Sequence, residues 1–165
     1  MQSTDLAVSA IVEHEGRFLI VEEYASGRRV LTQPGGHIET GESPEAAVVR
    51  ETLEETKCDV TCKELVGVYL WVDPTSLRRY VRIIFVADYL SCDDTLKFDD
   101  GVIARHWMTL AEIESKRFML RSPAVLRCMR DYVSGTRQSG TVLAELMPLQ
   151  KHVDRVLASA RIVQM

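Results

Sequence analysis

The chain has 165 residues, of which 46% are hydrophobic and 27% are charged. This size and composition predict one globular domain and exclude a disordered chain, which would be rich in charge and poor in aliphatic residues. The formal net charge of −4 argues against a nucleic-acid polymer as partner, because such partners normally meet a basic protein surface.

The first apolar run, Leu6 to Val12, contains Ser9 and has no basic residue before it. It predicts neither a signal peptide nor a membrane span, so we expect a cytoplasmic protein without a membrane partner. Cysteines are scattered through the chain without a CxxC pair, at Cys58, Cys62, Cys92 and Cys128. This scatter indicates reduced thiols in a core, with no redox or metal role.

The N-terminal third predicts an antiparallel hairpin followed by a shaped loop. Leu6 to Glu13 and Arg17 to Glu23 read as strands, and Gly16 between them supplies a positive φ. A third strand, Val30 to Thr32, leads into Gln33-Pro34-Gly35-Gly36. The two glycines of this loop let the backbone come close to another group.

The next segment predicts a helix from Ser43-Pro44-Glu45 to about Thr56, because serine, proline and glutamate suit its N-cap and first turn. Strands are expected at 59–72, 80–90 and 102–108. Thr109 to Glu112 is a capping box that should open a short helix.

Ser122-Pro123 opens a further predicted helix, which Gly135 can close in a left-handed cap. Its apolar positions at helical spacing are Val125, Leu126, Met129, Tyr132 and Val133. The order of elements predicts an α+β fold, an α/β/α sandwich. We expect this domain to span 1–135.

A C-terminal extension, 136–165, is expected to form a helix. Its apolar positions near helical spacing are Leu149, Val153, Val156, Leu157 and Ala160. Two interpretations stay open: the helix packs on its own domain, which we favour, or it forms a dimer contact. The sequence alone allows a monomer or a homodimer.

The predicted helix before Thr56 carries the chemistry. At about 100° per residue, Glu51, Glu54 and Glu55 share a stripe about 100° wide. Ala46, Val49, Leu53 and Thr56 lie near the opposite pole, so we expect that side to pack on a sheet and the carboxylates to face away. Like charges this close repel unless a cation lies among them.

A solvated acidic helix face is the ordinary explanation of such a stripe. Here Gly36, Glu42, Arg50 and the three glutamates occupy fixed offsets, a combination expected by chance on the order of once in 10⁷ at a given start. Glutamates on a helix suit Mg²⁺, which prefers oxygen ligands and often binds together with substrate phosphates. The reaction indicated is attack of water on phosphorus.

Residues Gly36 to Glu42 and Arg50 to Glu55 resemble the Nudix box. The resemblance implies an α/β/α sandwich with a mixed β-sheet, and Mg²⁺ or Mn²⁺ bound by Glu51, Glu54 and Glu55. It also implies that Gly35 adds a backbone carbonyl to the metal, while Arg50 and Glu42 orient the glutamates. Short matches outside the box resemble the Nudix phosphatases that act on nucleoside di- and triphosphates and on a thiamine-precursor pyrophosphate. They are Val21 to Glu23, Gln33 to Glu39, Trp71 followed by Pro74, Arg82, and Arg121 to Pro123.

The box departs from the family pattern at three positions, none of them a ligand. Thr52 and Cys58 stand where the family has aliphatic residues, and Lys57 stands where it has glycine. A lysine in a left-handed cap costs on the order of 1 kcal/mol relative to glycine. This cost predicts that the helix ends differently here. A later acidic residue used by many members has candidates in Asp99 and Asp100, although a solvated turn is the preferred interpretation there.

The candidate substrate contacts are arginines and one tryptophan. Arg82 is the strongest, because it interrupts an apolar strand where an unpaired arginine would be costly. Arg28 and Arg79 lie near the glycine loop or the long-strand turn and could clamp phosphate. Trp71 could stack on a ring, although a core position is the commoner use of a strand aromatic.

We therefore expect a Mg²⁺-dependent enzyme that cleaves a phosphate anhydride of a nucleoside di- or triphosphate or a similar small diphosphate, releasing orthophosphate. One alternative is a pyrophosphohydrolase that releases pyrophosphate. Another is a noncatalytic nucleotide-sensing module, which the intact glutamate set disfavours. A third is an isomerase of the Nudix fold, for which no suitably placed cysteine and glutamate are evident.

Overall fold

The computed structural model describes residues 4–25, 27–73 and 76–137. Its strands are β1 (Thr4–His14), β2 (Arg17–Ala25), β3 (Arg28–Thr32), β4 (Cys58–Val72), β5 (Arg79–Cys92) and β6 (Val102–Met108). Its helices are α1 (Pro44–Thr56), α2 (Leu110–Ser115), the 3-10 turn η1 (Arg117–Met119) and α3 (Pro123–Val133). The predicted order of elements is confirmed.

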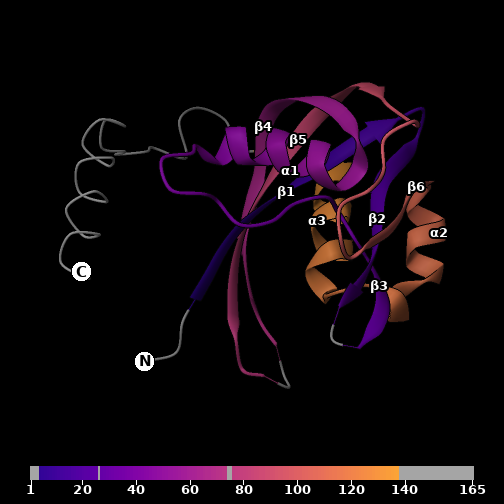
Figure 1. The fold of residues 1–165 in the computed structure, drawn as a ribbon. Coiled ribbons are helices and arrows are strands. Elements are labelled where there is room, and N and C mark those ends of the chain that lie inside the picture. The colour runs from indigo at the N-terminus through magenta and orange to yellow at the C-terminus, as the bar shows by residue number, and fades with distance from the viewer. Residues whose placement is uncertain (1–3, 26, 74–75, 138–165) are drawn as a thin grey trace.

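The strands form a mixed sheet of order β3-β2-β1-β5-β4, with β6 beside β2. β1 runs parallel to β5, and the other neighbours are antiparallel. In Figure 1, α1 covers one side of the strands, and α2 and α3 lie on the other. This arrangement is the predicted α/β/α sandwich.

Each face of the sheet has its own hydrophobic cluster. Side chains of β1 and β5, such as Val8 and Phe85, pack on Ala47 and Val48 of α1. On the opposite face Ile11 and Ile84 pack on α2 and α3. The Gly135 cap is present, with φ +85°. One predicted core position on α3 is wrong: Val133 is exposed, and the buried thiol of Cys128 fills the cluster instead.

β1 and β2 separate soon after their hairpin. Their Cα register pairs are confined to Glu13 with Phe18 and His14 with Arg17. The predicted glycine loop occupies the place beside β1 that β2 leaves, since Val8 N–H donates to the Gly36 carbonyl and Ala10 N–H to the Pro34 carbonyl, both at 2.9 Å. The divergence therefore brings the loop to the middle of the sheet.

The prediction of which side of α1 packs on the sheet is confirmed for Val49 and Thr56 and wrong for Ala46 and Leu53. Its buried residues are Pro44, Ala47, Val48, Thr52 and Thr56, whereas Ala46 and Leu53 are exposed. The two threonines can be buried because their hydroxyls donate to the carbonyls four residues earlier, at 2.7 and 2.5 Å. As a result Glu51 and Glu55 lie on the packed side, facing the glycine loop, and do not face away from the sheet.

The cysteine prediction is wrong for one pair. Cys58 and Cys92 are register partners on β4 and β5 and form a disulfide across 34 residues of sequence, which spacing alone does not reveal. Cys62 and Cys128 are free thiols, as expected. Disulfides are rare in reducing compartments, so the cytoplasmic location remains an expectation. No helix among the described residues is long and apolar enough to cross a membrane.

The predicted extension 136–165 lies outside the described residues from Gln138 onward. The expected helix at Leu149 to Ala160, and with it the boundary at residue 135, therefore stays a prediction.

Candidate active site

The glycine loop and α1 meet through backbone that only glycine allows. Gly35 has a φ of +151°, and a Cβ added to it would collide with the Val8 carbonyl oxygen. A Cβ on Gly36 would lie 2.5 Å from the carboxylate of Glu51. The close approach predicted for the two glycines is therefore present. Gly35 lies against β1, and Gly36 lies against Glu51, a predicted metal ligand.

Arg50 connects the predicted acidic residues. Its Nε and Nη2 donate to the two oxygens of Glu42 at 2.8 and 2.9 Å. Its Nη1 donates to Glu51 at 2.9 Å and to Glu54 at 3.0 Å. Nη2 also donates to the His37 carbonyl, which ties α1 to the loop. Bonding to Arg50 lowers the pKa of Glu42, so this carboxylate is a fixed anion that holds the guanidinium in place.

Glu55 is the most deeply placed of the three predicted metal ligands. Burial raises its pKa to about 8, and the charges of Glu23 and Glu51 act in the same direction. Burial also raises the pKa of Glu51. A bound cation would stabilise these carboxylates in their charged form. The site thus concentrates negative charge that the protein alone compensates only in part.

The three glutamates do not converge on one point in this structure. The Gly35 N–H donates to Glu55 at 2.8 Å, while Glu51 and Glu54 bond to Arg50. Within residues 4–25, 27–73 and 76–137 no three His, Cys, Asp or Glu side chains are grouped as a formed metal centre. Gly35 was predicted to offer its carbonyl, and the contact observed is made by its amide. The glutamates are gathered beside the loop, without being preorganised around an ion.

The departure at Lys57 does not alter how the helix ends. Lys57 adopts the left-handed conformation at φ 57° and ψ 28°, and its N–H donates to the Leu53 carbonyl. Its ammonium group donates to the Glu54 carbonyl at 2.8 Å and to Asp99 at 2.5 Å. These bonds offset the cost of a side chain at this position. Asp99, a candidate for the later acidic residue, is thereby engaged by a lysine.

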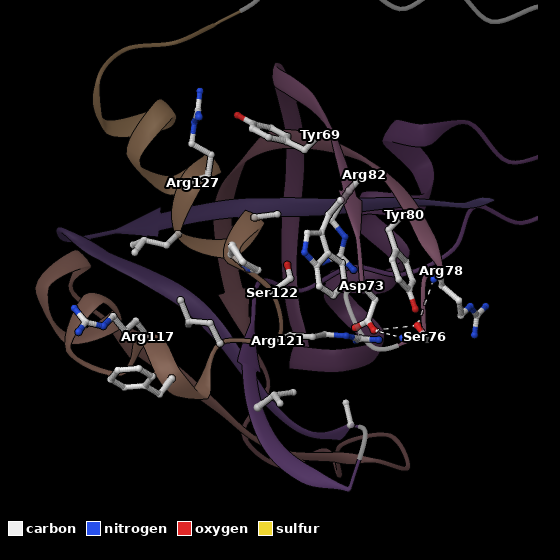
Figure 2. Close-up of a pocket in the computed structure, with 18 of the residues that line it drawn as sticks. Tyr69, Asp73, Ser76, Arg78, Tyr80, Arg82, Arg117, Arg121, Ser122 and Arg127 are labelled. Carbon is white, nitrogen blue, oxygen red and sulfur yellow. Dashed lines mark hydrogen bonds between the residues drawn. The ribbon is translucent and has the colours of Figure 1, made fainter. Parts of the chain in front are cut away.

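A cavity of about 1100 Å³ opens between the ends of β4 and β5 and the segment from η1 to α3 (Figure 2). Among the described residues, seven arginines line it, and Asp73 is the one acidic residue of the lining. The arginines are Arg28, Arg78, Arg82, Arg117, Arg121, Arg127 and Arg130. A cavity of this composition suits an anionic ligand.

Most of these arginines already have partners. Four form ion pairs with carboxylates: Arg78 with Asp5, Arg121 with Glu23, Arg127 with Asp131 and Arg130 with Glu114. Arg28 donates to the carbonyls of Phe118 and Leu120 at 3.0 and 3.3 Å. Neither Arg117, which lies over the Phe118 ring, nor Arg82 has a hydrogen bond or ion pair from its guanidinium to a described residue, and burial lowers the pKa of Arg82.

The predicted substrate contacts therefore separate in space. Arg82, Arg28 and Trp71 line the cavity, and Arg79 does not. Trp71 stacks on Tyr80 with ring centroids 5.4 Å apart. Figure 2 shows Arg82 and Arg121 directed toward the middle of the cavity from opposite walls, whereas Arg117 is directed outward. The cavity thus has one cation, Arg82, that is both central and unpaired among the described residues.

Sequence reasoning missed Glu23 and Arg121 as site residues. They come from β2 and from the residue before Ser122, and the Arg121 guanidinium lies 2.5 Å from the Glu23 carboxylate. The charges of both act on Glu55 and on Arg82, which links the acidic helix to the cavity. Ninety-eight residues separate the pair in sequence, so no local spacing could have revealed it.

Comparisons with known proteins agree with this geometry. The family model of the NUDIX domain matches residues 3–127. The chain is 32% identical to "Phosphatase NudJ" of Shigella boydii and 31% identical to that of Escherichia coli K12, each over 80% of this chain and 85% of the relative. A solved NUDIX hydrolase from Nitrosomonas europaea superposes with a TM-score of 0.82 at 35% identity, covering 87% of this chain and 97% of that one.

Proposed function

Because the chain belongs to the Nudix family and is a hydrolase acting on phosphoric anhydrides, we propose that it cleaves a nucleoside di- or triphosphate, or a similar small diphosphate, with Mg²⁺ or Mn²⁺ held by Glu51, Glu54 and Glu55. The single observation that carries the choice of substrate is the arginine-lined cavity, whose Arg82 is close enough to Glu55 for the two charges to interact. A phosphate chain is an anion that the arginines can bind directly and that a cation held by the glutamates can also coordinate.

The donor chemistry of α1 supports the metal assignment. All three side chains offer carboxylate oxygens, which Mg²⁺ and Mn²⁺ prefer. Two of the three have pKa values raised by burial, which favours uptake of a positive charge. When bound, such a cation neutralises phosphate charge and lowers the pKa of coordinated water. The Gly35 carbonyl is the proposed backbone ligand.

The remaining residues position the reactants. Glu42 fixes Arg50, and Arg50 in turn orients Glu51 and Glu54 through one guanidinium nitrogen. The glycine loop lets the Glu51 carboxylate lie close to β1, since a Cβ on Gly36 would meet that carboxylate and a Cβ on Gly35 would meet Val8. Arg82 is close enough to Glu55 for their charges to influence each other. A phosphate bonded to Arg82 would therefore lie beside the carboxylate cluster.

This anchoring predicts which bond breaks. If Arg82 holds the chain so that its terminal phosphorus faces the activated water, each event releases one orthophosphate. A nucleoside triphosphate then gives the diphosphate and afterwards the monophosphate. The similarity to relatives named as phosphatases supports attack at the terminal phosphorus over attack at the inner phosphorus, which would release pyrophosphate.

The test is a panel of nucleoside di- and triphosphates and small diphosphates, incubated with and without Mg²⁺, with products separated by chromatography. Orthophosphate is measured without added pyrophosphatase. We expect Mg²⁺-dependent orthophosphate and stepwise products. Pyrophosphate as the sole early product would overturn attack at the terminal phosphorus while leaving the metal assignment intact, and absence of turnover across the panel would favour a noncatalytic sensing module.

A further inference from the structure

One part of the sheet carries apolar side chains that no described element covers. On the α1 side, Leu6, Val68, Leu70 and Val72 are 47%, 56%, 67% and 44% exposed. We call these four residues the open apolar face. Single exposed apolar residues are ordinary on a protein surface, but a contiguous group of them usually marks a contact.

Strand register shows that the four residues are contiguous. Val81 of β5 is the partner of both Leu6 on β1 and Leu70 on β4, so these three side chains form one row across three strands. Ile83 pairs with Val8 and with Val68 in the next row. Paired residues lie on the same face of a sheet. Val8 and Ile83 pack beneath α1, so the open apolar face continues the core surface beyond the part that α1 covers.

The described chain ends next to this part of the sheet. Arg137, the last described residue, forms an ion pair with Glu64 of β4 at 3.2 Å. Leu70 is six residues further along β4, a distance of about 20 Å at the usual strand rise. β4 is the outermost strand on this side of the sheet. The residues after Arg137 therefore start at the edge that borders the open apolar face.

The remaining 28 residues, Gln138 to Met165, have the length and the pattern to cover it. Eleven residues before Leu149 can span roughly 35 Å when extended, more than the distance required. A helix from Pro148 to Ala160 would be about 20 Å long. Its apolar stripe of Leu149, Val153, Val156, Leu157 and Ala160 would suit a flat apolar sheet surface.

We propose that the C-terminal segment packs this stripe on the open apolar face of its own chain and so completes the helical layer that α1 begins. A sheet in a sandwich fold buries both faces against other elements, and α1 covers only part of this face. Of the two interpretations of the extension that the sequence leaves open, this one is packing on its own domain. It involves no residue of the acidic cluster or of the cavity.

The experiment is a double-mutant cycle on the full chain, read by thermal unfolding. Leu70→Asp changes the open apolar face and Leu157→Asp changes the C-terminal segment. Leu90→Asp is the control, because Leu90 on β5 is 60% exposed against 67% for Leu70 and is not part of the open apolar face. We expect Leu70→Asp and Leu157→Asp each to lower Tm by several °C. The double variant should be no less stable than the worse single variant, because both remove the same contact. Leu90→Asp combined with Leu157→Asp should be additive.

Two results would overturn the proposal. One is a Tm that either single variant leaves unchanged, or that the Leu70→Asp and Leu157→Asp pair lowers additively. The other is a dimer in sedimentation velocity that both substitutions dissociate, since the occupant would then be a second copy. Hydrogen exchange supplies an independent reading: truncation after Gln138 should speed exchange at residues 66–72 and leave residues 102–108 unchanged.

Discussion

The acidic side of α1 and the arginine-lined cavity are neighbours of opposite charge, built in different ways. Glu42, Glu51, Glu54 and Glu55 come from 14 consecutive residues, and one guanidinium serves three of them. The seven arginines of the cavity come from positions 28 to 130, and four have carboxylate partners of their own. The acidic side of α1 therefore has fewer positive charges than carboxylates. In the cavity, Arg117 contacts only a ring, and Arg82 alone has no hydrogen-bond, ionic or ring partner among the described residues.

The difference indicates that the acidic side of α1 binds metal and that the cavity binds the substrate. A compact set of carboxylates short of cations is suited to bind metal, because their repulsion is relieved only when an ion arrives. A cavity whose arginines are mostly neutralised has general affinity for anions but one specific anchoring point. Removing a charge from the first region should therefore act on turnover. Removing Arg82 from the second should act on substrate affinity.

The largest effect is expected at the glutamates. Glu54→Gln and Glu55→Gln should each lower kcat on the order of 10²-fold or more, since a metal ligand should matter at least as much as the outer-shell partners whose loss costs about 10- to 100-fold. The measurement is steady-state hydrolysis at saturating Mg²⁺. Glu45→Gln on the exposed first turn of α1 is the matched control and should retain wild-type turnover. Near-wild-type kcat in both ligand variants would falsify the metal assignment.

A smaller effect is expected at Arg82. Arg82→Gln should raise KM about 10- to 100-fold with a lesser change in kcat, as expected for loss of a charge-assisted hydrogen bond worth roughly 1.5–3 kcal/mol. Its melting temperature should not fall, because an unpaired buried cation is removed. Arg29→Gln is the control, since Arg29 pairs with Glu22 and does not line the cavity. A drop in kcat at unchanged KM would contradict an anchoring role.

The sequence predicted the two regions to different extents, because the acidic residues lie close together in the chain and the cavity residues do not. The glutamates lie within one helix, so their spacing was sufficient, and the capping residues Ser43 and Lys57 fixed where that helix begins and ends. The packed side of the helix was only partly predictable from apolar spacing, because Thr52 and Thr56 are buried through bonds to their own backbone. Arg82 stood out as a charge within an apolar strand, whereas Glu23 and Arg121 meet only through tertiary structure.

The smallest expected effect concerns stability without metal. The pKa of Glu55 is raised from 4.5 to about 8 by burial, so between these values the native state binds more protons than the unfolded state. Metal-free stability should therefore decline as pH rises from about 4.5 to about 8, which is measured as a falling Tm. Glu55→Gln should remove much of this decline, as followed by thermal unfolding in chelator. A Tm that rises over this interval in wild type would contradict the burial of an uncompensated carboxyl.

The most direct test of the central claim is titration of the protein with Mn²⁺, followed by electron paramagnetic resonance without substrate. The account predicts that wild type and Glu45→Gln bind Mn²⁺ with equal affinity, that Arg82→Gln binds it at least as well, and that the Glu54→Gln, Glu55→Gln double variant binds it at least 10-fold more weakly. Equal Mn²⁺ affinity in wild type and the double variant would contradict the claim that α1 holds the metal.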